Sequence, residues 1–336
     1  MTAPLIVTGA GGNLGRRVVD RLAPLFPVLA VDRFPPPSKV AGVEHHLIDL
    51  ALPSAATELD ALAKEAAVIV HLAWQPEGKG NLDMTRHVLS AATGMCPAQL
   101  VHVSSAMVYG AWPDNPVPLT EDAAPRPNPQ FSYAVQKRAA EALLERWSTE
   151  HRGTKVVLLR PACTLGSTEQ PLYRAPAAPR HPPLSSPARM VQFLHVDDLA
   201  EAVVHAVVAR LAGTYNVAPD SGVSEEEAGA IATGAASLPA PARTLLAAWD
   251  WFSSRRSFPA GAEAYAEHSW VVSPGKLAST GWRPQYSSAE ALLVTDAKGR
   301  WDDLPQPRRV ALTLAAAGVA AAASGAGGAA LWRRRR

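Results

Sequence analysis

A tyrosine and a lysine stand four residues apart in FSYAVQKRAA, at positions 133 and 137. The surrounding pattern predicts a helix over 132–147, on which residues four apart are neighbours. A nearby ammonium stabilises a phenolate and lowers the pKa of a tyrosine from its usual value of about 10. Tyr133 would then exchange a proton with a substrate hydroxyl or carbonyl, helped by Lys137. By itself the pair favours the simpler interpretation, an amphipathic helix with a surface lysine.

Two serines, Ser104 and Ser105, follow the apolar run LVHV. We expect them at the carboxyl end of a strand, where ligands of parallel α/β sheets bind. A serine hydroxyl there can hold a substrate oxygen toward Tyr133. Taken alone, the serines equally fit the end of a strand. Together with Tyr133 and Lys137 they favour acid–base chemistry on an oxygen atom.

A glycine-rich turn follows the first apolar run of the chain. In TGAGGNLG the glycines Gly9, Gly12 and Gly15 recur every third residue. Glycines there permit a tight turn and close approach of a pyrophosphate to a helix N-terminus. Asp32 ends the next apolar run, where a carboxylate accepts ribose hydroxyls and repels a 2′-phosphate. The predicted cofactor is NAD rather than NADP, and Arg33 leaves some tolerance of NADP.

The elements that must position these groups alternate along the first half of the chain. We expect strands over 4–10, 28–33, 44–50, 67–74, 100–110 and 155–161 and helices over 12–25, 55–66, 81–94 and 132–147. A further strand and helix are expected over 191–210, and a short strand over 213–218. Apolar runs without alternation indicate strands buried on both faces. The predicted fold class is α/β, a Rossmann-type doubly wound parallel sheet.

Composition changes after residue 165. We expect residues 1–165, with 190–217 returning, to form an NAD-binding domain. Residues 166–189 and 218–300 are expected to form a smaller C-terminal substrate-binding region. Within it, residues 171–187 contain six prolines, which predicts a loop or lid.

Charge and cysteine content exclude several functions. The net charge of +2 gives no electrostatic case for nucleic acid. The two cysteines, Cys96 and Cys163, are too few for a disulfide framework or a cysteine-based zinc site. The histidines of EHH at 44–46 lack the helical spacing of zinc-binding histidines. We therefore expect no metal. The start of the chain lacks a secretory pattern. We expect a cytoplasmic protein with a small-molecule substrate.

The end of the chain has a different character. Residues 301–309 read as a linker, and residues 310–336 as an apolar Ala/Gly-rich tail without charges up to Trp332. A helix of that length would reach about 34 Å, enough to cross a bilayer core of about 30 Å. Alanine and glycine insert weakly, however, so a transmembrane or membrane-associated helix is weighed against a low-complexity tail. Close approach of two such helices would support a homodimer.

Several motifs occur along the chain in this order: TGAGGNLG, IDL, HLAW, SSAMVYG, YAVQK, LLRP, HVDDLA and TYNVA. With these motifs the chain resembles the extended short-chain dehydrogenase/reductases, the NAD-dependent epimerase/dehydratase group. The resemblance covers roughly residues 4–217 and weakly the remainder to about 295. It implies that Ser105, Tyr133 and Lys137 are catalytic. The expected cofactor-binding residues, from the glycine turn and the resemblance together, are Gly9, Gly12, Asn13, Leu14, Gly15, Asp32, Arg33, Asp49, Leu50, Leu72, Ala73, Asn81, Ser104, Tyr133, Lys137 and Pro161.

Some of these positions have specific roles by resemblance. Asp49 and Leu50 would flank the adenine, Leu72 and Ala73 would line the cofactor channel, and Pro161 would lie beside the nicotinamide amide. Asn81 would lie near the cofactor.

The chain departs from the family pattern at two places. Met84 replaces the usual glycine of its helix, which we expect to alter packing rather than chemistry. Between Gly166 and His195 the chain lacks the glycine-rich, arginine-containing run with which nucleotide-sugar enzymes grip a diphosphate. Arg174, Arg180 and Arg189 remain candidate anion ligands.

The sequence therefore predicts an NAD-dependent oxidoreductase that transfers hydride at a secondary alcohol or carbonyl, with Tyr133 as general acid/base. One alternative is a nucleotide-sugar 4-epimerase or dehydratase with tightly bound NAD. A second is a non-catalytic NAD-binding sensor or scaffold, against which the intact Ser105, Tyr133 and Lys137 argue. No residue decides between net oxidation, reduction and epimerisation.

Overall fold

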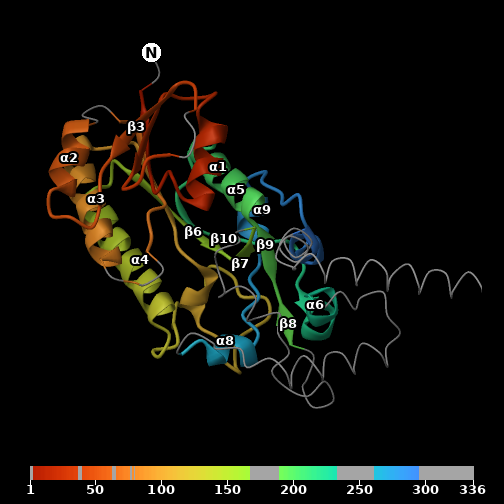
Figure 1. Cartoon of the computed structure of the whole chain (residues 1–336). Helices are drawn as coiled ribbons and strands as arrows, with labels where there is room; N and C mark the ends of the chain where they lie inside the picture. The colour runs from red at the N-terminus through yellow and green to blue at the C-terminus, as the bar shows by residue number, and fades with distance from the viewer. Residues whose placement is uncertain are drawn as a thin grey trace, which may run out of the picture. The chain divides into compact units, whose positions relative to one another are not determined.

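The computed structural model describes residues 3–36, 40–62, 66–75, 78, 80–166, 189–232 and 261–294. A seven-stranded sheet lies at its centre, in the order β10-β6-β5-β4-β1-β2-β3 (Figure 1). Its strands are β1 (Leu5–Thr8), β2 (Val28–Asp32), β3 (Val43–Leu47), β4 (Val68–His71), β5 (Gln99–Val103), β6 (Lys155–Pro161) and β10 (Gly213–Val217). Every pair is parallel, which confirms the predicted α/β, Rossmann-type sheet.

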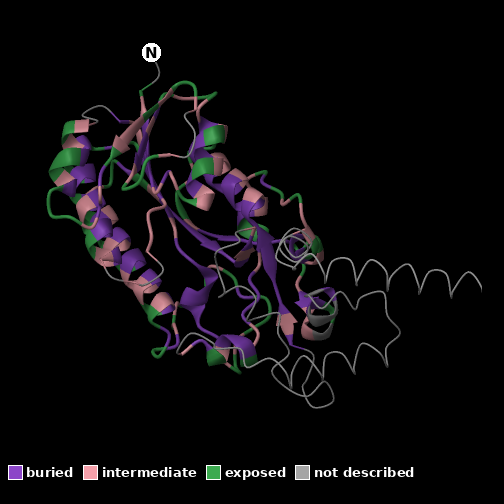
Figure 2. Ribbon diagram, in the orientation of Figure 1, coloured by how far each residue is buried: buried purple, intermediate pink, exposed green. Residues whose placement is uncertain are grey.

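Helices cover both faces of the sheet, so its central strands are apolar without alternation. On one face α1 (Asn13–Leu22) packs against α5 (Val196–Val208). On the other face α3 (Asn81–Met95) packs between α2 (Ala55–Leu62) and α4 (Ser132–Glu150). Figure 2 shows buried residues in the central strands of the sheet and along the inward sides of these helices, whereas the edge strand β3 has none.

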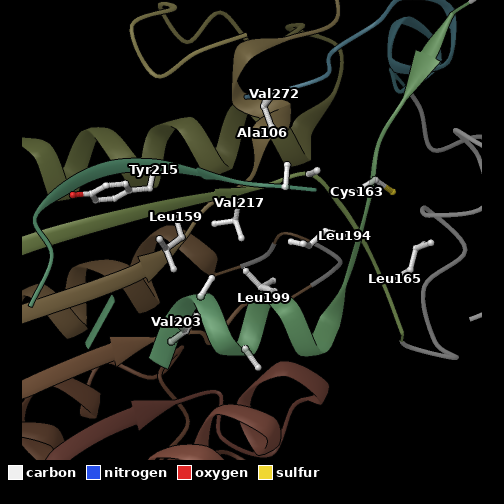
Figure 3. Close-up of a cluster of buried hydrophobic side chains, with 14 of the residues drawn as sticks. Ala106, Leu159, Cys163, Leu165, Leu194, Leu199, Val203, Tyr215, Val217 and Val272 are labelled. Carbon is white, nitrogen blue, oxygen red and sulfur yellow. The ribbon is translucent and has the colours of Figure 1, made fainter. Parts of the chain in front are cut away.

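The core divides into two clusters of buried hydrophobic residues. The larger one includes Leu199 and Val203 of α5 together with Leu159 of β6 and Val217 of β10 (Figure 3). The smaller one is built around α2 and α3, with Leu144 of α4 among its members. Because β6 and α5 are packed into the larger cluster, the strand ends from which the site loops begin are held firmly in place.

Shorter elements surround the carboxyl edge of the sheet. They are η1 (Ala106–Tyr109), β7 (Cys163–Leu165), β8 (Met190–Val191), β9 (Phe193–His195), β11 (Val223–Ser224), α6 (Glu225–Ala232), α8 (Glu263–Glu267) and α9 (Gly275–Ala278). β7 pairs with β9 in parallel, and β8 pairs with β11 antiparallel. Asp198, in the first turn of α5, accepts the backbone N–H groups of Gln285 and Tyr286 at 2.8 and 3.1 Å. This contact ties the segment 261–294 to the sheet.

Several predicted features fall outside the described residues: the proline-rich segment 171–187, with Arg174 and Arg180, the linker 301–309 and the tail 310–336. In the part of the chain that is described, no helix is long and apolar enough to span a membrane. The proposed division into a cofactor domain and a substrate-binding region remains a prediction.

Candidate active site

The candidate site lies where the strand order reverses between β1 and β4, at the carboxyl ends of the strands. Ligands of open α/β sheets bind at such switch points. Two cavities of about 390 Å³ each open there, and both are lined by Gly9, Gly12, Asn13, Leu72 and Trp74. The first continues toward β2 and β3, and the second toward β5, β6 and α4. A single elongated ligand can therefore reach from one to the other.

The glycine turn forms the shared wall of the two cavities. Gly9 has φ +70°, and a Cβ atom there would lie 2.6 Å from the backbone nitrogen of Ala73. A Cβ atom on Gly15 would lie 2.0 Å from the carbonyl oxygen of Gly9. Gly12 occupies the N-cap of α1 and offers no side-chain cap, so the first N–H groups of the helix are available to an anion. This cradle fits the pyrophosphate of a dinucleotide.

Asp32 closes the far end of the first cavity. Its carboxylate accepts the N–H of Gly11 at 2.9 Å and the N–H of Phe34 at 3.1 Å, which fixes its orientation. Arg33 also lines this cavity, and its guanidinium lies 4.8 Å from the centre of the Phe34 ring. The other predicted residues that line the first cavity are Asp49, Leu50, Leu72 and Ala73.

The second cavity brings together Ser105, Tyr133 and Lys137. Ser105 follows β5 and caps η1, where its Oγ accepts the N–H of Met107 at 3.2 Å. Tyr133 lies in the first turn of α4, and its phenol is hydrogen-bonded to the Ser105 side chain. Lys137 lies one turn further along α4. The end of β5 and the start of α4 therefore bring their predicted residues to the same cavity, as expected from the sequence.

The lysine ammonium is held away from the phenol. Lys137 Nζ donates to the carbonyl oxygen of Val103 at 2.9 Å and lies 3.6 Å from the centre of a Trp74 ring. Its distance from the centre of the Tyr133 ring is 6.0 Å. The indole of Trp74 meets the Tyr133 ring edge to face at 6.2 Å. Cation–π and carbonyl contacts therefore position this ammonium.

Burial sets the ionisation of both groups. It raises the pKa of Tyr133 to about 12, against the hydrogen bond from Ser105, which lowers it. It lowers the pKa of Lys137 to about 7, against the carboxylate of Glu141, which raises it. The sequence spacing predicted a lowered tyrosine pKa, and the direction in the structure is the opposite. The reason is that loss of hydration on burial dominates, while the Lys137 ammonium is directed at Val103 and Trp74 instead of the phenol.

The remaining predicted residues fall into two groups. Asn13, Leu14, Gly15, Ser104 and Pro161 line the second cavity. The Ser104 hydroxyl is buried without a hydrogen-bond partner among the described residues. A buried hydroxyl in that state fits a site that receives a polar ligand.

Asn81 and Arg189 have structural contacts instead. The Asn81 side chain accepts the N–H of Gln75 at 2.7 Å and donates to its carbonyl oxygen at 3.0 Å, which orders the chain just after Trp74. Arg189 donates to Glu225 at 3.2 Å and to the carbonyl oxygen of Tyr265 at 2.9 Å. Met84, in place of the family's glycine, lines the first cavity.

Among the residues of the second cavity that sequence reasoning missed are Trp74, Met107, Phe131, Cys163, Leu165 and Trp270. A signal existed for Trp74, because it directly follows Leu72 and Ala73 at the end of a central strand. The others come from separate loops and short elements. No local pattern marks them.

Comparisons with known proteins place the chain in a family. The sequence profile of the NAD dependent epimerase/dehydratase family matches residues 5–218. An uncharacterized protein of Mycobacterium tuberculosis is 28% identical over 235 residues, which are 64% of this chain and 62% of that protein. An uncharacterized protein of Sinorhizobium fredii is 32% identical over 133 residues, which are 38% of this chain and 32% of that protein. The chain thus spans less than two thirds of the length of these curated relatives.

Two further matches carry functional names. The NAD-dependent glucose-6-phosphate dehydrogenase of Haloferax volcanii is 28% identical over 182 residues, which are 48% of this chain and 68% of that enzyme. The UDP-glucose 4-epimerase of Thermus thermophilus, solved with NAD, superposes with a TM-score of 0.66 at 22% identity, covering 88% of this chain and 99% of that one. The superposition shows a common fold. The profile match over more than half of the chain shows that this protein belongs to the NAD-dependent epimerase/dehydratase family.

Proposed function

We propose that the protein is an NAD-dependent oxidoreductase acting at a secondary alcohol or carbonyl. The observation that supports this most is the convergence of Ser105, Tyr133 and Lys137 on a cavity that shares the glycine turn with a second, Asp32-lined cavity. NAD, when bound, supplies the hydride donor or acceptor. The glycine turn would hold its pyrophosphate, Asp32 its ribose hydroxyls, and Asp49 and Leu50 its adenine.

The proposed chemistry of the chain's own residues is a proton transfer. Ser105, fixed at the start of η1, holds the substrate oxygen beside the Tyr133 hydroxyl. Because its pKa lies at about 12, the phenol of Tyr133 is protonated at neutral pH and suited to donating a proton to a carbonyl oxygen. Lys137 supplies a positive charge to this cavity as long as it is protonated, with its ammonium 6.0 Å from the centre of the Tyr133 ring. The protonated state of Tyr133 favours carbonyl reduction, because reduction needs a proton donor, whereas alcohol oxidation would need Tyr133 to be deprotonated first.

The pKa of Lys137 gives a pH dependence. Its ammonium is fully present below pH about 7 and is lost as the pH rises through that value. We therefore expect kcat/KM for NADH-dependent ketone reduction to be level in acid and to fall above pH about 7, while Tyr133 stays protonated. Rates measured from about pH 5 to about pH 10 test this, and Lys137→Met should give a lower, flat profile. A wild-type profile that stays level to about pH 9 contradicts it.

Asp32 sets the choice of cofactor in this proposal. Asp32→Asn keeps one oxygen, which can accept one of the two N–H groups of Gly11 and Phe34, and it removes the charge that repels a 2′-phosphate. We expect the ratio of kcat/KM with NADH to that with NADPH to fall about tenfold, which is about 1.4 kcal/mol. Asp83→Asn is the matched control, because Asp83 lies on the surface in an ion pair with Arg86. A wild-type preference for NADPH would refute the role of Asp32.

A nucleotide-sugar 4-epimerase or dehydratase is the second candidate, and the family membership itself favours it. Such an enzyme retains its NAD and returns it oxidised after each turnover. Turnover of UDP-glucose without added cofactor, by protein that co-purifies with NAD, would support this candidate over the first. Mass spectrometry of small molecules that co-purify with the protein tests both, because it reports cofactor and substrate together.

A further inference from the structure

The second cavity is walled by a continuous row of aromatic rings. From Trp74 the row passes to Tyr133 at 6.2 Å, to Phe131 at 5.7 Å, to Tyr265 at 5.1 Å and to Trp270 at 5.8 Å between ring centres. All of these except Tyr265 line the cavity. Such spacings are typical of offset and edge-to-face packing. The row therefore forms a packed aromatic side of the cavity that includes Tyr133.

Other lining residues are apolar. Met107, Cys163, Leu165, Val196 and Leu199 also line the cavity, and Cys163, Leu165 and Leu199 belong to the buried cluster in Figure 3. A hydrogen bond from the Tyr265 hydroxyl to the Met107 carbonyl oxygen, at 2.7 Å, fixes the position of Met107. These side chains cannot turn toward solvent without disrupting the core.

The polar side chains of this cavity, beyond Ser104, Ser105, Tyr133 and Lys137, already have partners. Asn13 donates to the carbonyl oxygen of Gly166 at 3.1 Å and accepts from Arg17. Thr164 donates to the carbonyl oxygen of Ala162 at 3.1 Å. Among the described lining residues, few hydrogen-bonding groups remain for a substrate with a hydroxyl on every carbon. A buried hydroxyl without a partner loses its hydrogen bond to water.

We infer that this cavity takes an apolar cyclic ketone or secondary alcohol, whose carbonyl or carbinol oxygen reaches Ser105 and Tyr133 and whose ring packs on Phe131 and Trp270. The inference rests on the proposed function in taking this cavity as the place of the reacting carbon. Burial of an apolar ring against these side chains provides the binding free energy. Aromatic side chains also contact sugar rings, but a sugar would additionally require hydrogen bonds, for which the described residues of this cavity offer few free groups.

Binding to the protein–NADH complex tests the inference separately from turnover. The probes are 1-tetralone, a bicyclic aryl ketone, and UDP-glucose, each titrated by calorimetry into the full chain saturated with NADH. We expect the Kd of 1-tetralone to be about tenfold lower than that of UDP-glucose, or lower still, and a tenfold difference corresponds to about 1.4 kcal/mol of binding free energy. Equal or tighter binding of UDP-glucose, or no binding of 1-tetralone at about 10 mM, overturns the inference. If 1-tetralone binds but no hydride is transferred, the proposed reaction fails and the inference on the cavity stands.

Three variants localise the binding. Trp270→Leu should weaken the binding of 1-tetralone about fivefold or more. Trp270→Phe keeps an aromatic ring, guards against a folding defect and should weaken this binding less. Trp112→Leu is the matched control, because Trp112 lies outside both cavities and contacts Arg126. Equal affinity in Trp270→Leu and Trp112→Leu, with unchanged melting temperatures, would contradict the placement of the ring on Trp270.

Discussion

The Tyr133→Phe variant is expected to lose about 10²- to 10⁴-fold in kcat for ketone reduction, while its Kd for NADH stays close to that of the wild type. The change removes one hydroxyl, which is the proposed proton donor and the partner of Ser105. The ring itself remains packed between Trp74 and Phe131, so the cavity keeps its shape. A selective loss of kcat would identify an interaction made in the transition state rather than in binding.

Tyr215→Phe is the matched control for this loss. The Tyr215 hydroxyl donates to the carbonyl oxygen of Ala212 at 3.1 Å and lines neither cavity. It should retain the wild-type kcat. A Tyr133→Phe enzyme with a near-normal kcat would remove Tyr133 from the mechanism, and it would leave the NAD site as a binding site only.

The Arg160→Met variant is expected to lower the free energy of unfolding by about 3–5 kcal/mol. Arg160 is 3% exposed and Glu141 is fully buried. The guanidinium donates from Nε and from a terminal nitrogen to the two Glu141 oxygens, at 2.9 and 2.8 Å. Its other terminal nitrogen donates to the Tyr109 hydroxyl at 2.9 Å, which in turn donates to Asn216. Removal of Arg160 would leave the buried Glu141 carboxylate with Arg138, at 3.5 Å, as its remaining ion-pair partner among the described residues.

The double variant Arg160→Met with Glu141→Met distinguishes this cause from lost packing. It removes both charges and should recover most of the loss, because apolar replacement of a whole buried pair is often neutral. Arg146→Met, which affects the exposed pair with Glu150 at 4.0 Å, should cost less than about 1 kcal/mol. Urea unfolding of all three measures these values. A cost for Arg160→Met no larger than for Arg146→Met would contradict the argument.

The two predictions are connected through η1. Tyr109, at the end of η1, is held by Arg160, and Ser105 caps the start of the same short helix. The buried charge pair therefore supports the turn that presents Ser105 to Tyr133. A partly folded Arg160→Met protein is expected to lose kcat more than affinity for NADH.

The residues proposed for the cofactor side of the site could be brought together from sequence because their signals are local. Gly9, Gly12 and Gly15 lie in one turn, and Asp32 and Leu72 end or directly follow strands of a parallel sheet. Since carboxyl ends of parallel strands meet at one edge, strand assignment was enough to bring these residues together. The same reasoning placed Ser105 opposite Tyr133.

The rest of the site depends on tertiary contacts that no spacing encodes. The pKa of Tyr133 rises because of burial, which is a property of the assembled cavity. Lys137 is directed at Val103 and Trp74, although the i to i+4 relation suggested Tyr133 as its partner. The aromatic row has Trp74 and Trp270 at its two ends, and only the fold brings residues so distant in sequence into one row.

Transfer of deuterium from NADH labelled at the nicotinamide C4 tests the central claim most directly. The labelled cofactor is incubated with a panel of alicyclic, aryl and sugar ketones, and the products are analysed by mass spectrometry. We predict that wild-type protein delivers one deuterium to the carbinol carbon of a product and that Tyr133→Phe delivers almost none. Label that stays in the nicotinamide with every ketone, under conditions where NADH is bound, would contradict hydride transfer as the function of this site.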